Sequence, residues 1–320
     1  MANASSAQRD AQTNPRVCVW RTTENPRICD EHHRLTIAGR QFPPAEPGQF
    51  ITLAAPSPAD ERTVSFARQS PFYLRRAFSI AGLRRTSSEV EIDVLYRVVG
   101  AATSWMAGLT ADDPVSVIGP LGNRFPVSDS KRHAWLVAGG AGLPPVLWMA
   151  EALQRRGKEA TAFYGARSRN LLPLSVPRPG ELPRDGITVS HGVLEFSRCG
   201  VPVIVSTDDG SIGYAGNVVE SVRRFAATYA IDVADLVVYA CGPEPMLRSL
   251  SEWAVGREVQ CYLCTERAMA CGMGTCQSCV IPVRSGTDPA GWEYKLCCTD
   301  GPVFGAADVL WQIDGESAPT

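Results

Sequence analysis

The chain has 320 residues, of which 45% are hydrophobic and 20% are charged, and its formal net charge is −2. This length is sufficient for two or three domains, each with its own core. Neither sign of charge is in excess, so we expect neither nucleic acid nor a membrane surface as a partner. The polar stretch over 1–16 lacks the apolar run of a signal peptide and predicts a disordered tail.

Residues 17–128 consist of short alternating or apolar runs separated by turn-forming residues. Such runs predict antiparallel strands that close a small β-barrel. A stretch rich in Pro, Ser and Arg at 55–72 interrupts them and predicts a surface loop. The predicted strands include 34–38, 49–53, 90–96 and 114–118.

Residues 129–256 show a different pattern, in which apolar strands alternate with helices. This order predicts a doubly wound parallel α/β sheet. We expect strands over 133–138, 160–164, 201–206 and 236–240, and helices over 146–156 and about 245–253.

Two loops of this α/β region are candidates for nucleotide binding. The glycine turn after its first strand contains Gly140 and Gly142, and Cys241-Gly242-Pro243 follows a later strand. Ligands of open α/β sheets bind outside the carboxyl ends of the strands, so both loops should face one crevice. In place of the acidic residue that would bind a ribose after the second strand, the sequence has Gly165-Ala-Arg167. The sequence therefore does not choose between NADH and NADPH as the nucleotide.

The C-terminal part, residues 257–320, contains seven of the eleven cysteines. Cys271, Cys276 and Cys279 form a C-x4-C-x2-C run, which a Cys297–Cys298 pair follows after two strand-like segments, 279–283 and 292–296. This spacing is the plant-type pattern of a [2Fe–2S] cluster. The alternative is a structural zinc site, which more often has two C-x2-C pairs.

The barrel region carries a second group of candidate ligands, around Arg76, Ser79 and the stretch 100–103. Arg76 can pair with a phosphate, Ser79 can hydrogen bond to a ring nitrogen, and amides before a helix at 104–109 can hold a pyrophosphate. Together they are compatible with a flavin nucleotide site. The alternative is a solvated strand edge.

These segments together resemble the dihydroorotate dehydrogenase electron transfer subunit family, within the ferredoxin–NADP reductase superfamily. The resemblance covers roughly 45–305, and its two cysteine segments are absent from the superfamily's many other reductases. The matching segments are LRRAFSI (74–80), LYRVVGAAT (95–103), GPLGNRF (119–125), VAGGAGLPP (137–145), DDGSIGYAGNV (208–218), YACGPEPML (239–247), ERAMACGMGTCQSC (266–279) and CCTDGPVF (297–304).

The resemblance implies FAD in the barrel, a [2Fe–2S] cluster in the C-terminal part and NAD(P) as substrate. It implies Cys271, Cys276 and Cys279 as cluster ligands, with Cys298 favoured over Cys297 because one residue separates it from the Asp-Gly-Pro-Val-Phe run. The FAD contacts that it implies are Arg76, Ala77, Phe78, Ser79, Leu95, Tyr96, Arg97, Ala102 and Thr103.

Three features depart from the family pattern. Ala102 stands where glycine is usual, Cys261 and Cys264 form an additional C-x2-C, and the interval from Cys279 to Cys298 is long. Hydrolytic chemistry is not expected, because no G-x-S-x-G is present and the four histidines have no metal-binding spacing.

The function that the resemblance implies is electron transfer between a separate catalytic subunit and NAD(P). In the family that subunit bears FMN and oxidises dihydroorotate in pyrimidine biosynthesis, which implies a cytoplasmic hetero-oligomer. One alternative is a reductase of the same architecture that serves another acceptor, such as a ferredoxin. A second alternative is a zinc-stabilised nucleotide-binding module without turnover.

Overall fold

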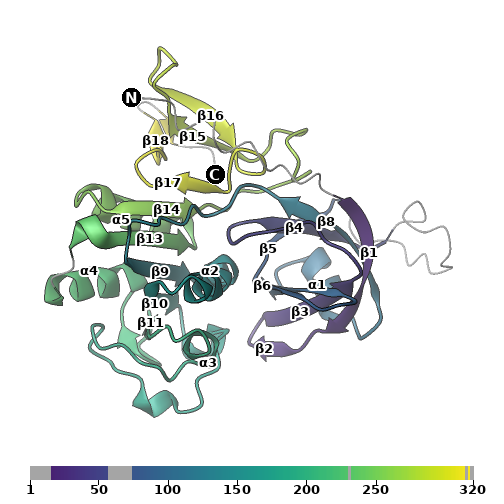
Figure 1. The fold of residues 1–320 in the computed structure, drawn as a ribbon, viewed down its shortest axis with the longest axis horizontal. Helices are drawn as coiled ribbons and strands as arrows, with labels where there is room; N and C mark the ends of the chain where they lie inside the picture. Colours follow the sequence, from purple (N-terminus) through teal and green to yellow (C-terminus); the bar gives the residue numbers. More distant parts are fainter. Residues whose placement is uncertain (1–15, 57–73, 230–231, 314–315, 318–320) are drawn as a thin grey trace.

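A computed structural model describes residues 16–56, 74–229, 232–313 and 316–317. It contains a curled antiparallel sheet, a parallel sheet covered by helices, and a C-terminal segment of small hairpins (Figure 1). The tail predicted over 1–16 and the loop predicted over 55–72 lie almost entirely outside the described residues.

The curled sheet has eight strands in the order β5-β4-β8-β1-β3-β7-β6, with β2 paired to β3. Alternate side chains point inward because successive residues of a strand face opposite sides, and Leu35, Ile37 and Ile92 are fully buried. The rings of Phe78 and Tyr96 meet edge to face at 6.1 Å, which joins β5, at one end of this order, to β7, the next to last strand at the other. The elements are β1 (Arg16–Glu24), β2 (Arg27–Cys29), β3 (His32–Gly39), β4 (Phe50–Ala54), β5 (Arg76–Ser79), β6 (Gly82–Arg85), β7 (Val90–Arg97), α1 (Ala101–Ala107) and β8 (Pro114–Leu121).

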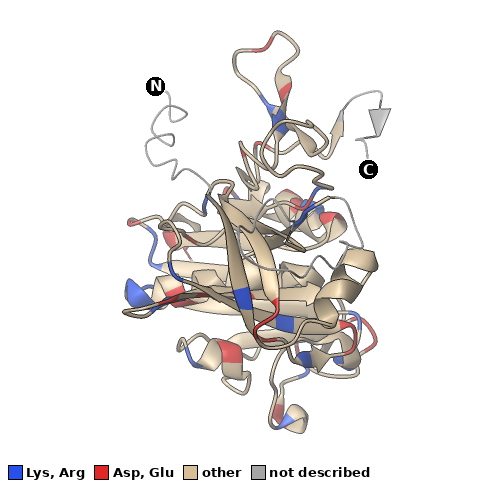
Figure 2. Ribbon diagram, turned by 90° about the vertical axis from the view of Figure 1, so that its right-hand side faces the viewer, with Lys and Arg blue, Asp and Glu red and all other residues tan. Residues whose placement is uncertain are grey.

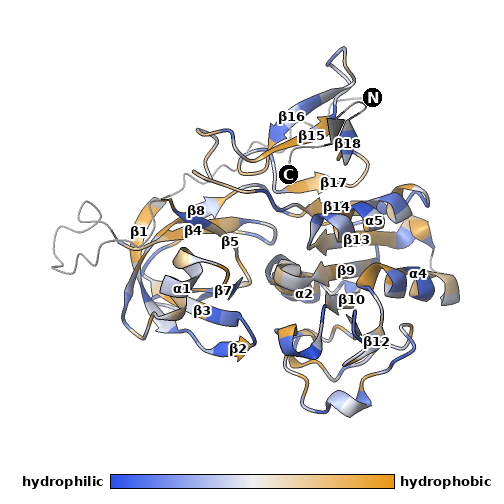
Figure 3. Cartoon of the chain, turned by 180° about the vertical axis from the view of Figure 1, so that it is seen from behind, coloured by the Kyte–Doolittle hydropathy of each residue, from blue (hydrophilic) through white to orange (hydrophobic). Residues whose placement is uncertain are grey.

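The second sheet has seven strands in the order β12-β11-β10-β9-β13-β14-β17, all parallel to their neighbours except β17. Its central strand β9 is buried from Ala134 to Gly139, as expected for a strand with helices on both faces. Figure 3 shows the apolar character of these central strands. The strands are β9 (His133–Gly139), β10 (Glu159–Ala166), β11 (Val203–Thr207), β12 (Tyr214–Ala215), β13 (Leu236–Cys241), β14 (Gln260–Cys264) and β17 (Val303–Gly305).

Helices cover both faces of this parallel sheet. The α2 side chains pack in the apolar cluster on one face, and those of α4 and α5 pack in the cluster on the other. Helix α4 begins at Asn217, whose side-chain oxygen accepts a 3.0 Å hydrogen bond from the Glu220 amide. The helices are α2 (Leu143–Arg155), α3 (Leu194–Ser197), α4 (Val218–Thr228) and α5 (Glu244–Val255), with short 3-10 turns η1 (Gly140–Gly142), η2 (Arg169–Leu171), η3 (Pro179–Glu181) and η4 (Val233–Asp235).

The C-terminal segment contacts both the parallel sheet and the curled sheet. Strands β14 and β17 lie at the edge of the parallel sheet, although the sequence division begins the C-terminal part at residue 257. Beyond them lie two hairpins, β15 (Val280–Arg284) with β16 (Trp292–Leu296), and β18 (Gln312–Ile313) with β19 (Glu316–Ser317). The apolar cluster of the β15–β16 hairpin includes Phe50 and Leu121 of the curled sheet.

The predicted fold class, a β-barrel with a doubly wound sheet and a small C-terminal cysteine-rich part, is therefore confirmed. In the part of the chain described, no helix is long and apolar enough to cross a bilayer. On the side of the molecule seen in Figure 2, basic and acidic residues are interspersed over the surface.

Asn123, in the segment after β8, connects the barrel to the C-terminal segment. Its side-chain nitrogen donates hydrogen bonds to the carbonyls of Asp300 (2.9 Å) and Val303 (2.8 Å). Its side-chain oxygen accepts a 2.8 Å bond from the Val303 amide. One amide side chain therefore uses both of its ends to hold β17 against the barrel.

We expect Asn123→Ala to destabilise the protein by about 2 kcal/mol, because it removes three hydrogen bonds and leaves backbone groups unpaired. For a chain of this size the melting temperature should fall by about 4 °C in a thermal scan. Ser130→Ala is the control, since the Ser130 hydroxyl is exposed and, among the described residues, hydrogen bonds only to Ser128. Equal melting temperatures for the two variants would contradict this role of Asn123.

Candidate functional site

The cysteine loop, residues 266–279, is a tight turn whose backbone requires glycine. Gly272 and Gly274 have φ of +75° and +88°, values that side chains disfavour. A Cβ at Gly272 would lie 2.8 Å from Cγ2 of Thr52, and one at Gly274 would lie 3.0 Å from Cγ2 of Thr299. The loop thus packs directly on barrel strand β4.

Backbone amides of this loop point at cysteine sulfurs. Cys271 Sγ accepts hydrogen bonds from the amides of Met273 and Cys276, both at 3.4 Å. Cys298 Sγ accepts a 3.2 Å hydrogen bond from the Gly274 amide. Such N–H···S bonds stabilise thiolates and tune the reduction potential of iron–sulfur clusters.

The four candidate sulfurs lie near one another. The Cys276 thiol is a neighbour of the Cys271 thiol, and the Cys298 thiol is a neighbour of the Cys279 thiol and also feels the charge of Cys271. A two-iron cluster needs two thiolates on each iron, whereas a single zinc ion needs all four around one point. The proximity of these four thiols is compatible with a [2Fe–2S] site.

The two neighbouring cysteines at 297 and 298 face different surroundings. Cys297 is fully buried, and its sulfur lies 3.4 Å from the Thr265 hydroxyl. Cys298 faces the cysteine loop through Gly274 and Cys279. Burial is the main cause that raises the pKa of Cys297 to about 11 and that of Cys298 to about 12.

Cys276 is the exposed member of the group. Its sulfur lies 3.2 Å from the Ser278 hydroxyl. Hydrogen bonds first from Ser278 and then from Cys271 lower the pKa of its thiol to about 6. A thiol with this pKa is largely deprotonated at neutral pH, which is the form that binds metal.

The candidate flavin residues lie on two strands and a helix of the barrel. Arg76, Ala77, Phe78 and Ser79 form the half-buried strand β5, while Leu95, Tyr96 and Arg97 end strand β7. Tyr96 donates a 3.1 Å hydrogen bond to Asn25, and burial raises its pKa to about 12.

Helix α1 brings Ala102 and Thr103 next to the end of β7. The Thr103 hydroxyl donates to the Gly100 carbonyl (3.0 Å) and accepts from the amides of Val99 (2.9 Å) and Gly100 (3.1 Å). Thr103 therefore orders the start of α1. Ala102, which stands where the family pattern has glycine, is buried in the helix.

The glycine turn and the Cys241-Gly242-Pro243 loop touch through their backbones. A Cβ at Gly142 would lie 2.2 Å from the Cys241 carbonyl oxygen, and one at Gly242 would lie 3.1 Å from the Gly139 amide. The Tyr164 hydroxyl donates a 3.0 Å hydrogen bond to the carbonyl of Gly140, which has φ +52°. The two loops predicted to share one crevice are therefore in contact.

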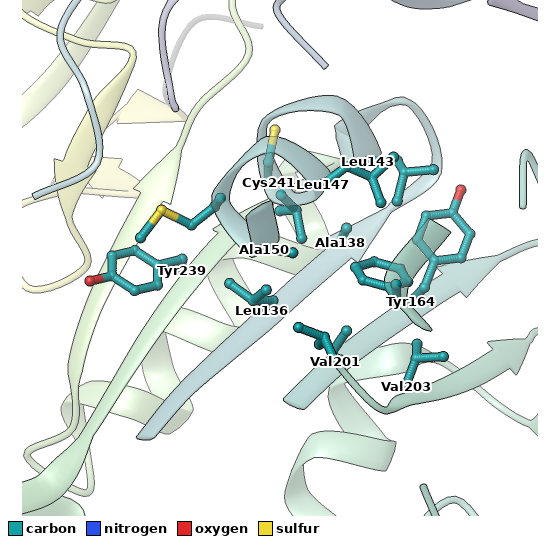
Figure 4. Packing of buried hydrophobic residues seen from close by; sticks show 14 of the residues in the cluster. Leu136, Ala138, Leu143, Leu147, Ala150, Tyr164, Val201, Val203, Tyr239 and Cys241 are labelled. Carbon is teal, nitrogen blue, oxygen red and sulfur yellow. The ribbon is translucent and has the colours of Figure 1, made fainter. Parts of the chain in front are cut away.

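Cys241 itself is fully buried, in the apolar cluster between the sheet and α2 (Figure 4). It is paired in register with Cys264 on the neighbouring strand β14. Contact with the Cys264 thiol, followed by burial, raises the pKa of Cys241 well above its usual value. The sulfur of Cys241 thus faces its neighbour strand in the interior.

The two acidic residues that begin the matching segment 208–218 received no individual role from the sequence. Asp208 and Asp209 follow β11, and their amides donate to the carbonyls of Ala166 (3.1 Å) and Arg167 (3.2 Å). The carboxyl edge of the sheet therefore carries acidic residues beside Arg167. Their position directly after a buried strand was the available signal.

Comparisons with known proteins agree with this geometry. The model of the iron–sulfur cluster binding domain of dihydroorotate dehydrogenase B matches residues 266–310. The electron transfer subunit of dihydroorotate dehydrogenase B (NAD(+)) from Geobacillus kaustophilus is 34% identical over 88% of this chain and 94% of that protein. The subunit of the same name from Streptococcus mutans is 29% identical over 89% and 93%.

Solved structures share the fold at lower identity. An NADH-dependent reduced ferredoxin-NADP oxidoreductase matches with TM-score 0.68 and 23% identity, covering 91% of this chain and 90% of that one. The Amycolatopsis cytochrome P450 reductase matches with TM-score 0.54 and 21% identity, over 76% and 66%.

The curled sheet, the nucleotide sheet and the cysteine loop define an iron–sulfur flavoprotein with a ferredoxin–NADP reductase-like fold, whose cofactors are FAD and [2Fe–2S] and whose substrate is NAD(P). The chain belongs to the family of dihydroorotate dehydrogenase B electron transfer subunits. The resemblance inferred from its motifs is confirmed.

The contact between the two nucleotide-side loops predicts a cost for any side chain at Gly142. We expect Gly142→Ala to destabilise the protein by about 2 kcal/mol, because its methyl group would meet rigid backbone at Cys241. The measurement is a thermal scan of the purified protein. Gly180→Ala is a matched control, since no atom lies within 4 Å of the added Cβ there. The prediction fails if both variants melt together.

Proposed function

We propose that this chain transfers electrons between a partner dehydrogenase and NAD through a [2Fe–2S] cluster and FAD. The observation that carries the proposal is the packing of the cysteine loop on the flavin barrel. Cys279, Cys297 and Cys298 share one apolar cluster with Phe50 and Leu121 of the barrel. The candidate flavin residue Ala77 packs against the same cluster, which supports a short separation between the proposed cluster and the proposed flavin site.

The proposed partner is an FMN-bearing catalytic subunit that oxidises dihydroorotate in pyrimidine biosynthesis. Support comes from the relatives, which are named electron transfer subunits of dihydroorotate dehydrogenase B. We therefore propose a hetero-oligomer. A cytoplasmic location is proposed with it, and the eleven free cysteines suit a reducing compartment.

The proposed cluster ligands are Cys271 with Cys276 and Cys279 with Cys298. The proximity of the four thiols and the amides of Met273, Cys276 and Gly274 support this set. Cys297 is left out, because its sulfur faces the buried Thr265.

The proposed flavin contacts come from β5, the end of β7 and the start of α1. Arg76 and Arg97 would pair with the phosphates, and Ser79 would hydrogen bond to the ring. Support comes from the Phe78–Tyr96 contact, which joins β5 and β7 along the half-buried face of the barrel. The remaining proposed contacts are Ala77, Phe78, Leu95, Tyr96, Ala102 and Thr103.

For the nicotinamide nucleotide, the proposed site is the crevice beside Gly140, Gly142 and Cys241-Gly242-Pro243. Because glycine has no side chain, the backbone of these loops is accessible, and we propose that main-chain groups bind the nucleotide. We propose NAD over NADP, because Asp208 and Asp209 would repel a 2′-phosphate. The names of the relatives, which specify NAD(+), support this choice.

The proposed division of the chain follows the two sheets and the cysteine loop. Residues 17–128 would form the FAD-binding unit, 129–256 the nucleotide unit and 257–320 the cluster unit. Strands β14 and β17 connect the last two, since both hydrogen bond into the parallel sheet.

When bound, the flavin exchanges a hydride with nicotinamide and single electrons with the cluster. The chain's own residues hold these groups in order. The amides around Cys271 and Cys298 stabilise thiolate charge, and the barrel face at Phe50 and Leu121 keeps water away from Cys279 and Cys298. No side chain is proposed as an acid or base.

Substitutions in the cysteine pair test the ligand set. We expect Cys298→Ser to lose most of the iron and the visible iron–sulfur absorbance, because an iron loses its thiolate. Cys297→Ser is the matched control, being adjacent and equally buried, and should keep both. Metal analysis and the visible spectrum of each purified variant provide the measurement. The opposite result would assign Cys297 as the ligand. Zinc without iron in the purified protein would favour the alternative of a zinc-stabilised nucleotide-binding module.

The function is tested by co-expression with an FMN-bearing dihydroorotate dehydrogenase subunit from the same cell. We expect the two chains to co-purify and to reduce NAD+ with dihydroorotate, at least tenfold faster than NADP+. The Cys298→Ser complex should assemble but lose this activity. A chain that instead reduces a ferredoxin with NADH, and binds no such subunit, would support the alternative acceptor.

A further inference from the structure

The turn between β2 and β3 places Glu31 against Arg97. Oε2 of Glu31 accepts hydrogen bonds from Arg97 Nε at 2.6 Å and is 2.5 Å from a terminal guanidinium nitrogen. The Glu31 carbonyl accepts a 2.7 Å hydrogen bond from the Val98 amide. Backbone and side chain of one residue therefore both bind the end of β7.

The turn itself is held in one conformation. Glu31 has φ 61°, a left-handed value that a non-glycine residue adopts only where its surroundings impose it. The Asp30 amide donates a 2.9 Å hydrogen bond to the Asn170 carbonyl, in the nucleotide part of the chain. The Cys29 sulfur lies 3.4 Å from His32 Nδ1. The Glu31 carboxylate is thus presented by a fixed backbone.

The contact uses only one edge of the guanidinium. One carboxylate oxygen of Glu31 contacts both Nε and one terminal nitrogen of Arg97. Among the described residues, the other terminal nitrogen of Arg97 has no hydrogen-bond acceptor. Arginine binds phosphate through its fork of N–H groups. Because Glu31 holds one edge of the Arg97 guanidinium, the N–H groups of the opposite edge point in a fixed direction.

The Glu31 carboxylate has two opposing effects on phosphate binding by Arg97. It repels an incoming phosphate, and it restricts the long Arg97 side chain. Both side chains are partly exposed, 36% for Arg97 and 47% for Glu31, so water screens the repulsion. Arg167 across the turn lies close enough to lower the pKa of Glu31, so a second cation offsets the carboxylate charge further. Screening by water and the charge of Arg167 therefore weaken the repulsion, whereas the restriction of the Arg97 side chain remains.

We propose that Glu31 is a positioning residue for the flavin nucleotide, which holds Arg97 ready for the phosphates of FAD. This role rests on the proposed function, in which Arg97 binds FAD. Glu31 itself would not touch the cofactor, and it acts through one arginine.

The test is the FAD dissociation constant of the full chain stripped of flavin, measured by flavin fluorescence. We expect Glu31→Gln to weaken FAD binding about threefold to fivefold, the range of an exposed ion pair. Asp30→Asn is the control, because it removes the same charge from the same turn but its partner is Arg27. It should leave the constant unchanged.

A double-mutant cycle with Arg97→Gln separates a positioning role from a structural one. If Glu31 acts through Arg97, Glu31→Gln has no further effect once Arg97 is replaced. Equal losses in both backgrounds, or unchanged or tighter FAD binding by Glu31→Gln alone, would overturn the inference. Melting temperatures of the flavin-free variants, expected to be equal, exclude misfolding.

Failure of the proposed function gives a different pattern. A wild-type chain that binds no FAD, or an Arg97→Gln variant that binds FAD as tightly as wild type, would remove the flavin assignment. The role of Glu31 would then be lost with it. Normal FAD binding by wild type with a clear loss in Arg97→Gln leaves only Glu31 in question.

Discussion

The packing of the cysteine loop against the barrel is the constraint on which the rest of the structure depends. Gly272 lies so close to Thr52 that a side chain would not fit between them. The pairing of β17 with β14 and the hydrogen bonds of Asn123 hold the segment behind the loop. These contacts hold the barrel, the parallel sheet and the cysteine loop in fixed relative positions.

Backbone groups form many of the contacts at the candidate cluster site and at the candidate nicotinamide site. Amides point at Cys271 and Cys298, and the glycine turn meets the Cys241 carbonyl at Gly142. Because the surrounding sheets hold these main-chain groups in place, the groups have little conformational freedom to lose when a cofactor binds. Glu31 extends this arrangement, because a rigid turn holds the flexible Arg97.

Local patterns predicted much of the fold. The alternating run at 90–96 and the apolar run at 133–138 became β7 and β9, because burial on one face or on both leaves a direct signature in the sequence. The helix expected from Val146 begins earlier, at Leu143, since proline is tolerated in a first helical turn. Strand β14 was not predicted, because its place in the sheet depends on β13 and β17.

The sequence by itself determined the cofactor chemistry and the family, because thiolate spacing and glycine turns are properties of short segments. Only the tertiary structure decided which way neighbouring side chains face. It turned Cys297 toward Thr265 and Cys298 toward Gly274, buried Cys241 against Cys264, and brought Glu31 to Arg97. Each of these contacts joins residues that lie far apart in the chain or on different strands, and such pairings depend on how whole sheets pack.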